Sequence, residues 1–147
     1  MHHGVDSDER KETSIAKTIL GVPLALIVWG IVYVASHIAL YLLDLSRGLA
    51  DDWIQTLFRE WFTPGVGGFV AIATVGTFVR GANLRWVAVS FCSPIVLVYI
   101  GVSLIIMIGY GERFEYSIGE QLTQWGTALA TCIGAAIGVR KYERHSA

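Results

Sequence analysis

The sequence predicts an all-α membrane protein, a bundle of four transmembrane helices with an amphipathic interfacial helix between the first two. Two observations predict this fold class. Of the 147 residues, 54% are hydrophobic and only 16% are charged, whereas soluble domains carry about 25% charged residues. The charges are also segregated, because four stretches that together hold 90 residues contain no Asp, Glu, Lys or Arg: 18–43, 61–79, 86–111 and 121–139. In water these stretches would expose large apolar surfaces.

The same composition excludes several other classes of protein. A disordered chain has low hydrophobicity and high net charge, and a small secreted disulfide domain is rich in cysteine. This chain has two cysteines and a net charge of −1. A nucleic-acid binder would need a basic surface, so we expect no nucleic-acid partner and expect the lipid bilayer to surround the protein.

Each predicted span is long enough to cross a bilayer as a helix. About 20 apolar residues at 1.5 Å per residue cover a hydrocarbon core of about 30 Å. We place the spans at 19–43, 62–79, 86–108 and 122–139. They form one transmembrane domain, 19–139, between an N-terminal tail, 1–18, expected to be solvated with a short helix, and a C-terminal tail, 140–147.

The charged flanks predict the orientation. Eight Lys and Arg residues lie in the two tails and the 80–85 link, against three in the other two loops. Positive residues are enriched on the cytoplasmic side, so we expect both termini to be cytoplasmic. The compact chain favours a bacterial inner membrane.

The six-residue link 80–85 predicts a tight antiparallel hairpin of the second and third spans. Gly81 and Asn83 are turn formers, and so short a link keeps its two helices adjacent. We expect this hairpin to be the most secure helix contact in the fold.

The first loop predicts an interfacial helix over 50–61. Its apolar residues recur at helical spacing and form one face, and we expect it to end where Pro64 and the following glycines turn the chain inward. Two interpretations stay open: a connector that seals the bundle, or a docking face for a partner subunit or a lid. The face consists of Trp53, Leu57, Phe58 and Trp61.

Small residues recur every four positions in the fourth span. They are Gly126, Ala130, Gly134 and Gly138. Small residues at this spacing let two helices approach closely in lipid. The pattern is compatible with packing inside the chain, self-association through the fourth span, or pore lining.

One histidine, His37, lies inside a predicted span, and intramembrane ionisable groups are costly and often functional. Tyr33 and Tyr41 share its helix face. Counted from the ends of their spans, Ser103 and Thr127 lie at a similar depth, which predicts a polar layer in the outer half of the bundle. His37 is either a neutral, hydrogen-bonded structural residue or a site that accepts a proton or binds a ligand.

The sequence lacks the motifs of common enzymes. It has no nucleotide-binding glycine loop, HExxH, CxxC, GxSxG or carboxylate pair, and its histidines have no metal-site spacing. We therefore expect no enzymatic activity, cofactor or metal. No predicted span carries Asp or Glu, which disfavours an antiporter that works through a membrane carboxylate.

The sequence therefore favours a non-catalytic accessory, assembly or scaffold component of a membrane complex or homo-oligomer. The alternative is a small oligomeric channel or proton-linked transporter that uses the polar layer around His37.

Overall fold

The computed structural model describes residues 5–47, 56–110 and 118–146. Within these ranges the chain is helical and contains no strand. The elements are α1 (Val5–Arg47), a π-helical turn η1 (Phe58–Phe62), α3 (Thr63–Phe78), α4 (Leu84–Tyr110) and α5 (Ile118–Ser146). The all-α class is confirmed.

Three helical segments are long and apolar enough to cross a membrane: Glu12–Leu43, Phe58–Phe78 and Leu84–Ile106. They indicate an integral membrane protein. The described side chains of α5 begin at position 125, and within them no fourth such segment is found.

The N-terminal helix is much longer than the predicted first span. α1 runs without interruption over 43 residues, about 64 Å at the rise of an α-helix, so most of the predicted tail is helical. Acidic residues at positions 6, 8 and 9 suit a helix N-terminus, where the macrodipole favours negative charge.

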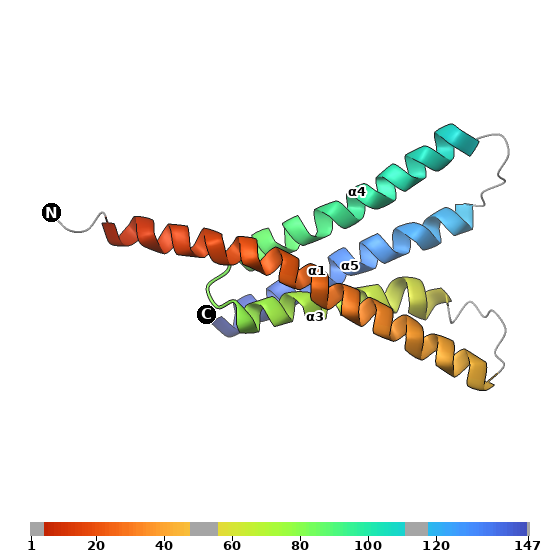
Figure 1. The fold of residues 1–147 in the computed structure, drawn as a ribbon, viewed down its shortest axis with the longest axis horizontal. Helices are drawn as coiled ribbons and strands as arrows, with labels where there is room; N and C mark the ends of the chain where they lie inside the picture. The colour runs from red at the N-terminus through yellow and green to blue at the C-terminus, as the bar shows by residue number, and fades with distance from the viewer. Residues whose placement is uncertain (1–4, 48–55, 111–117, 147) are drawn as a thin grey trace.

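The helices converge at one end of the bundle and separate at the other (Figure 1). The C-terminus and the turn between α3 and α4 lie at the converging end, which we call the turn end. α1 crosses the other helices, and its C-terminal half diverges from that of α4 (Figure 1). The protein core is therefore concentrated towards the turn end, and its largest fully buried side chains include Phe91, Ile72, Val75 and Val87.

The turn between α3 and α4 is tight, as the sequence predicts. Gly81 has a φ of +87°, a conformation that glycine adopts without the strain of a Cβ. The Asn83 side chain accepts a 3.3 Å hydrogen bond from the Trp86 amide and so caps α4. α1 is tied to this turn, because the Thr18 hydroxyl accepts from the Asn83 amide at 3.0 Å.

The prediction that this hairpin makes the most secure helix contact is wrong. α3 and α4 share only a small contact, whereas α3 packs most extensively on α5. The short link fixes the direction of the two helices near the turn only. Farther along, the small residues of α5 allow a closer approach to α3 than the larger side chains of α4 do.

The prediction that the interfacial helix ends where the chain turns at Pro64 is also wrong. Phe62 and Thr63 both have right-handed helical backbone angles, and η1 continues directly into α3. Pro64 lies at the start of α3, and because it has no N–H, a carbonyl of the preceding turn lacks its helical donor; the Glu60 carbonyl accepts instead from the Thr127 hydroxyl. The predicted interfacial helix 50–61 lies partly outside the described residues, and its C-terminal part joins α3.

Candidate functional site

An aromatic ladder runs along α1. The rings of Trp29 and Tyr33 stack with centroids 5.2 Å apart, and the rings of Tyr33 and His37 are 4.2 Å apart. The spacing of four residues places all three on one helix face. Trp29 also makes an edge contact with Phe91 of α4, so the ladder begins in the core and leads away from it.

The hydrogen bond of His37 fixes which ring nitrogen carries a proton. Its Nδ1 lies 2.9 Å from the carbonyl oxygen of Tyr33. A carbonyl oxygen only accepts, so Nδ1–H donates. In the neutral imidazole Nε2 is then the atom that can accept a proton.

Glu60 on η1 forms the second part of the site. The Thr127 hydroxyl of α5 lies 2.8 Å from Glu60 Oε2 and 3.1 Å from the Glu60 carbonyl oxygen, and it donates to these acceptors. Arg59 Nε donates to Glu60 Oε1 at 2.9 Å. The Glu60 side chain is only 18% exposed, so its carboxylate is held largely inside the protein by two donors.

The two parts of the site are close to one another. α1 contacts η1, which carries Glu60, and η1 packs on α5, which carries Thr127. The helices α1, η1 and α5 build this site together.

The structure brings together only part of the predicted polar layer. Tyr33 contacts His37, but the partner of Thr127 is Glu60. Tyr41 is 65% exposed. Ser103 forms no side-chain hydrogen bond with a described residue, and it lies on the half of α4 that diverges from α1 (Figure 1).

Glu60 is the residue that sequence reasoning assigned to the wrong environment. The second span was expected to begin at Phe62, so Glu60 was counted as a loop residue. The structure includes it in the apolar helical segment Phe58–Phe78. Glu60 therefore lies on the same continuous helix as the residues of the predicted second span. If the helical periodicity of the residues before Pro64 had been continued through Pro64 without a break, it would have placed Glu60 on this helix.

The small-residue face of α5 packs on α3 of the same chain. A Cβ added to Gly134 would overlap the Gly65 carbonyl oxygen, and one on Gly68 would overlap the Thr131 carbonyl oxygen. Gly138 packs on Ile72. Gly126 meets the Trp61 ring, and Ala130 lies beside Gly65. This face is therefore covered and is not free for contact with a second copy.

The apolar face predicted in the first loop is partly used inside the protein. Leu57, Phe58 and Trp61 are exposed on one side and line a shallow hollow with Phe62. Trp61 also packs on Gly126. The fourth predicted residue of this face, Trp53, lies outside the described residues.

An apolar groove runs between α3 and α5. It has a volume of about 340 Å³. Its floor contains Gly65, Ala130 and Gly134, and its rims carry large exposed side chains. The rim residues are Trp61, Phe62, Val66, Phe69, Ile133 and Ile137.

Among the described residues, no group of three or more His, Cys, Asp and Glu side chains could hold a metal ion. Comparison of the chain with family models, with curated proteins and with solved structures found no match.

Proposed function

We propose that this chain is a non-catalytic component of a membrane complex, and that it acts by packing against a transmembrane helix of another protein subunit. The apolar groove between α3 and α5 carries the proposal. Glycines and an alanine form its floor, and they already pack on each other within the chain. The incoming helix would therefore contact the large side chains on the rims.

The exposed surface of the chain supports this function. Ile133 and Ile137 on α5 are more than half exposed, because both point away from the face that covers α3. Phe62 at the start of the same groove is 60% exposed. An apolar surface beside a floor of small residues is typical of helix–helix association in membranes.

The proposed topology has four spans with both termini in the cytoplasm of a bacterium. α5 packs along α3 through Gly134 and Gly138, so a bilayer that contains α3 also surrounds α5. Basic residues gather at the turn end: Lys17, Arg80, Arg85, Arg140, Lys141 and Arg144. The positive-inside rule places this end in the cytoplasm. Reporter fusions after Arg85 and after Tyr142 should both read cytoplasmic.

Purification in mild detergent tests the proposed function. We expect a second membrane protein to co-purify in a fixed ratio. In Val66→Trp the bulky ring fills the groove from its rim and should release that protein. Val34→Trp is the matched control, because Val34 is similarly exposed but lies on α1, away from the groove. A chain that purifies alone, or a loss that is equal in both variants, contradicts the proposal.

A second candidate is a small oligomeric channel or proton-linked transporter. The paired carboxylate of Glu60 and the proton-accepting Nε2 of His37 favour it, because both lie on segments apolar enough to cross a membrane. In proteoliposomes of the pure protein, flux should change with pH. His37→Gln should abolish that change, and Tyr41→Phe should not. Pure protein without any flux would exclude this candidate.

A further inference from the structure

A second cavity lies at the turn end, far from the groove between α3 and α5. It has a volume of about 430 Å³ and lies where α3, the turn, α4 and α5 meet. Its walls are Gly76, Thr77, Val79, Arg80, Gly81, Ala82, Leu84 and Tyr142. None of these residues belongs to the site built around Glu60 and His37.

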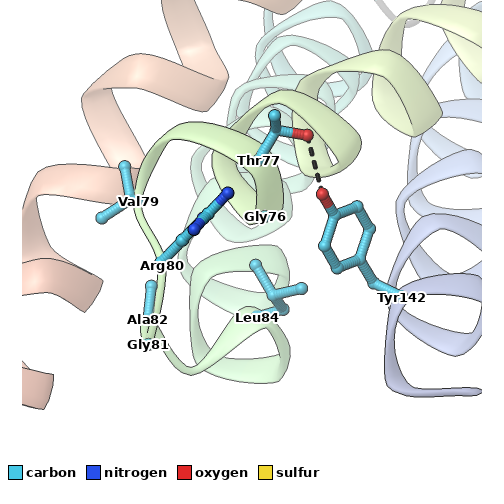
Figure 2. Close-up of a pocket in the computed structure, with 8 residues that line it drawn as sticks. All are labelled: Gly76, Thr77, Val79, Arg80, Gly81, Ala82, Leu84 and Tyr142. Atoms are coloured by element: carbon cyan, nitrogen blue, oxygen red, sulfur yellow. Dashed lines mark hydrogen bonds between the residues drawn. The ribbon is translucent and has the colours of Figure 1, made fainter. Parts of the chain in front are cut away.

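Three polar side chains line this cavity: Arg80, Thr77 and Tyr142. The Thr77 hydroxyl donates to the Ala73 carbonyl at 2.9 Å, so the Tyr142 hydroxyl, 2.7 Å away, donates to Thr77. Figure 2 shows the Arg80 side chain extending from the turn towards Thr77, with the Tyr142 ring on the opposite wall and Leu84 between them. A group that entered the cavity would meet a guanidinium and two hydroxyls, with apolar side chains next to them.

Arg80 is available to bind an anion. No side chain in the described ranges pairs with it, whereas Arg85 beside it is occupied by Glu143, with contacts of 2.6 and 2.8 Å. Lys17 of α1 lies on the other side of the turn, with its Nζ 3.7 Å from the place that a Cβ on Gly81 would take. It likewise has no acidic partner among the described residues. Two cations without a counter-ion among the described residues therefore lie at this turn, Arg80 in the cavity wall and Lys17 next to Gly81.

The cavity lies at the level where lipid headgroups are expected. α3 ends at Phe78 and the apolar part of α4 begins near Trp86, and both rings are exposed, at 77% and 63%. Exposed aromatic rings at the ends of spans are typical of the interface between lipid and water. A phosphate ester held here by Arg80 would have its apolar portion directed into the bilayer.

We propose that this cavity binds the phosphate headgroup of an anionic phospholipid, with Arg80 as the principal contact, the Tyr142 hydroxyl as a donor that turns from Thr77 to the phosphate, and Lys17 as a supporting charge. A basic pocket between transmembrane helices has the chemistry that binds such headgroups, and the planar guanidinium of arginine can contact two phosphate oxygens at once. The lipid would join α3, α4 and α5 at their converging ends. This inference does not depend on a protein partner.

Native mass spectrometry of the purified full chain, titrated with phosphatidylglycerol in detergent, tests the proposal. We expect one phosphatidylglycerol to be retained per chain, and phosphatidylcholine to be retained more weakly. Arg80→Gln should weaken retention by about tenfold, as expected for the loss of a charge-assisted contact. Arg80→Lys should recover part of it, because the charge returns without the bidentate geometry.

Arg144→Gln is the matched control. It removes one exposed positive charge at the same end of the molecule but outside the cavity, and it should change retention by less than about twofold, as expected for a surface charge. Tyr142→Phe supplies a second variant that keeps the ring while removing its hydroxyl, and it should weaken retention by a smaller factor than Arg80→Gln.

Three results would overturn the proposal. Equal losses in Arg80→Gln and Arg144→Gln would show that lipid is attracted by surface charge and not held in the cavity. Equal retention of phosphatidylcholine and phosphatidylglycerol would exclude selection by charge. Binding of glycerol phosphate as tight as that of phosphatidylglycerol would assign the cavity to a soluble phosphate ester.

Discussion

Gly134 of α5 lies directly against the carbonyl oxygen of Gly65 of α3, with no space for a Cβ between them. This contact lies in the largest helix interface of the protein. In lipid, such an interface is held by packing and by interhelical contacts, because the hydrophobic effect no longer favours burial. Any atom added at Gly134 must separate the two helices.

The first prediction concerns this close approach. Gly134→Ala should destabilise the bundle by about 1–3 kcal/mol, the usual cost of overpacking. Gly101→Ala is the control, because no atom lies within 4 Å of the Cβ that it would add on α4. This control should be neutral or stabilising by up to about 1 kcal/mol, since alanine is the better helix former. Thermal unfolding in detergent measures both, and equal stabilities would contradict the α3–α5 packing described above.

The second prediction concerns the hydrogen bond between Thr127 and Glu60. Thr127→Val keeps the side-chain shape but removes the donor, and it should cost about 0.6 kcal/mol, the average for hydrogen bonds between membrane helices, and at most about 1.7 kcal/mol. Thr74→Val is the control, because the Thr74 hydroxyl donates only to the Val70 carbonyl within its own helix.

A double-mutant cycle of Thr127→Val with Glu60→Gln isolates the pair. We expect a coupling free energy that favours the native pair. Additive effects of the two substitutions would mean that the two side chains do not interact in the folded protein.

The third prediction is a dependence of stability on pH at the turn end. The hydrogen bond from Arg85 lowers the pKa of Glu143. The ion pair therefore stabilises the fold above the unfolded pKa of about 4.3, and this contribution is lost as the pH falls through the lower folded pKa. Glu143→Gln should make the unfolding temperature less sensitive to acid. Both groups are exposed, so the difference should be small and should shrink in high salt. An unchanged acid sensitivity in the variant would contradict it.

The fourth prediction uses the two cysteines. Cys92 of α4 and Cys132 of α5 are free, and their side chains interact with each other where α4 packs on α5. A membrane-permeant thiol oxidant should join them within one chain, with the loss of the mass of two hydrogen atoms in the intact protein. Cys132→Ser should abolish that loss. Cross-linking between chains, without the loss inside a chain, would contradict the register of α4 on α5.

The sequence predicts the helices far better than their partners. The charge-free stretches locate the spans because crossing a bilayer depends on the local run of apolar residues. The small-residue row of α5 likewise indicates a close contact, but its spacing alone does not identify the partner helix. That choice depends on the complementary glycines of α3, Gly65 and Gly68, which the sequence analysis interpreted as turn formers.

The site was predictable only in part. The spacing of Tyr33 and His37 places them on one helix face, and the structure brings their rings together. The depth calculation that grouped His37 with Ser103 and Thr127 treated the helices as parallel and equally spaced, whereas α1 and α4 diverge. Glu60 was missed because Pro64 was taken as a break, although proline is well tolerated in the first turn of a helix.

The crossing of α1 has a mechanical consequence. α1 packs tightly on α3 and α4 at Gly21, where an added Cβ would lie 2.9 Å from Val75 and 3.0 Å from Val87. From Gly21 to Leu43 the helix extends about 33 Å. A tilt of about five degrees at Gly21 therefore sweeps the distant end through about 3 Å. A slight tilt of α1 near the turn therefore becomes a larger displacement of its C-terminal end, on the other side of the bilayer.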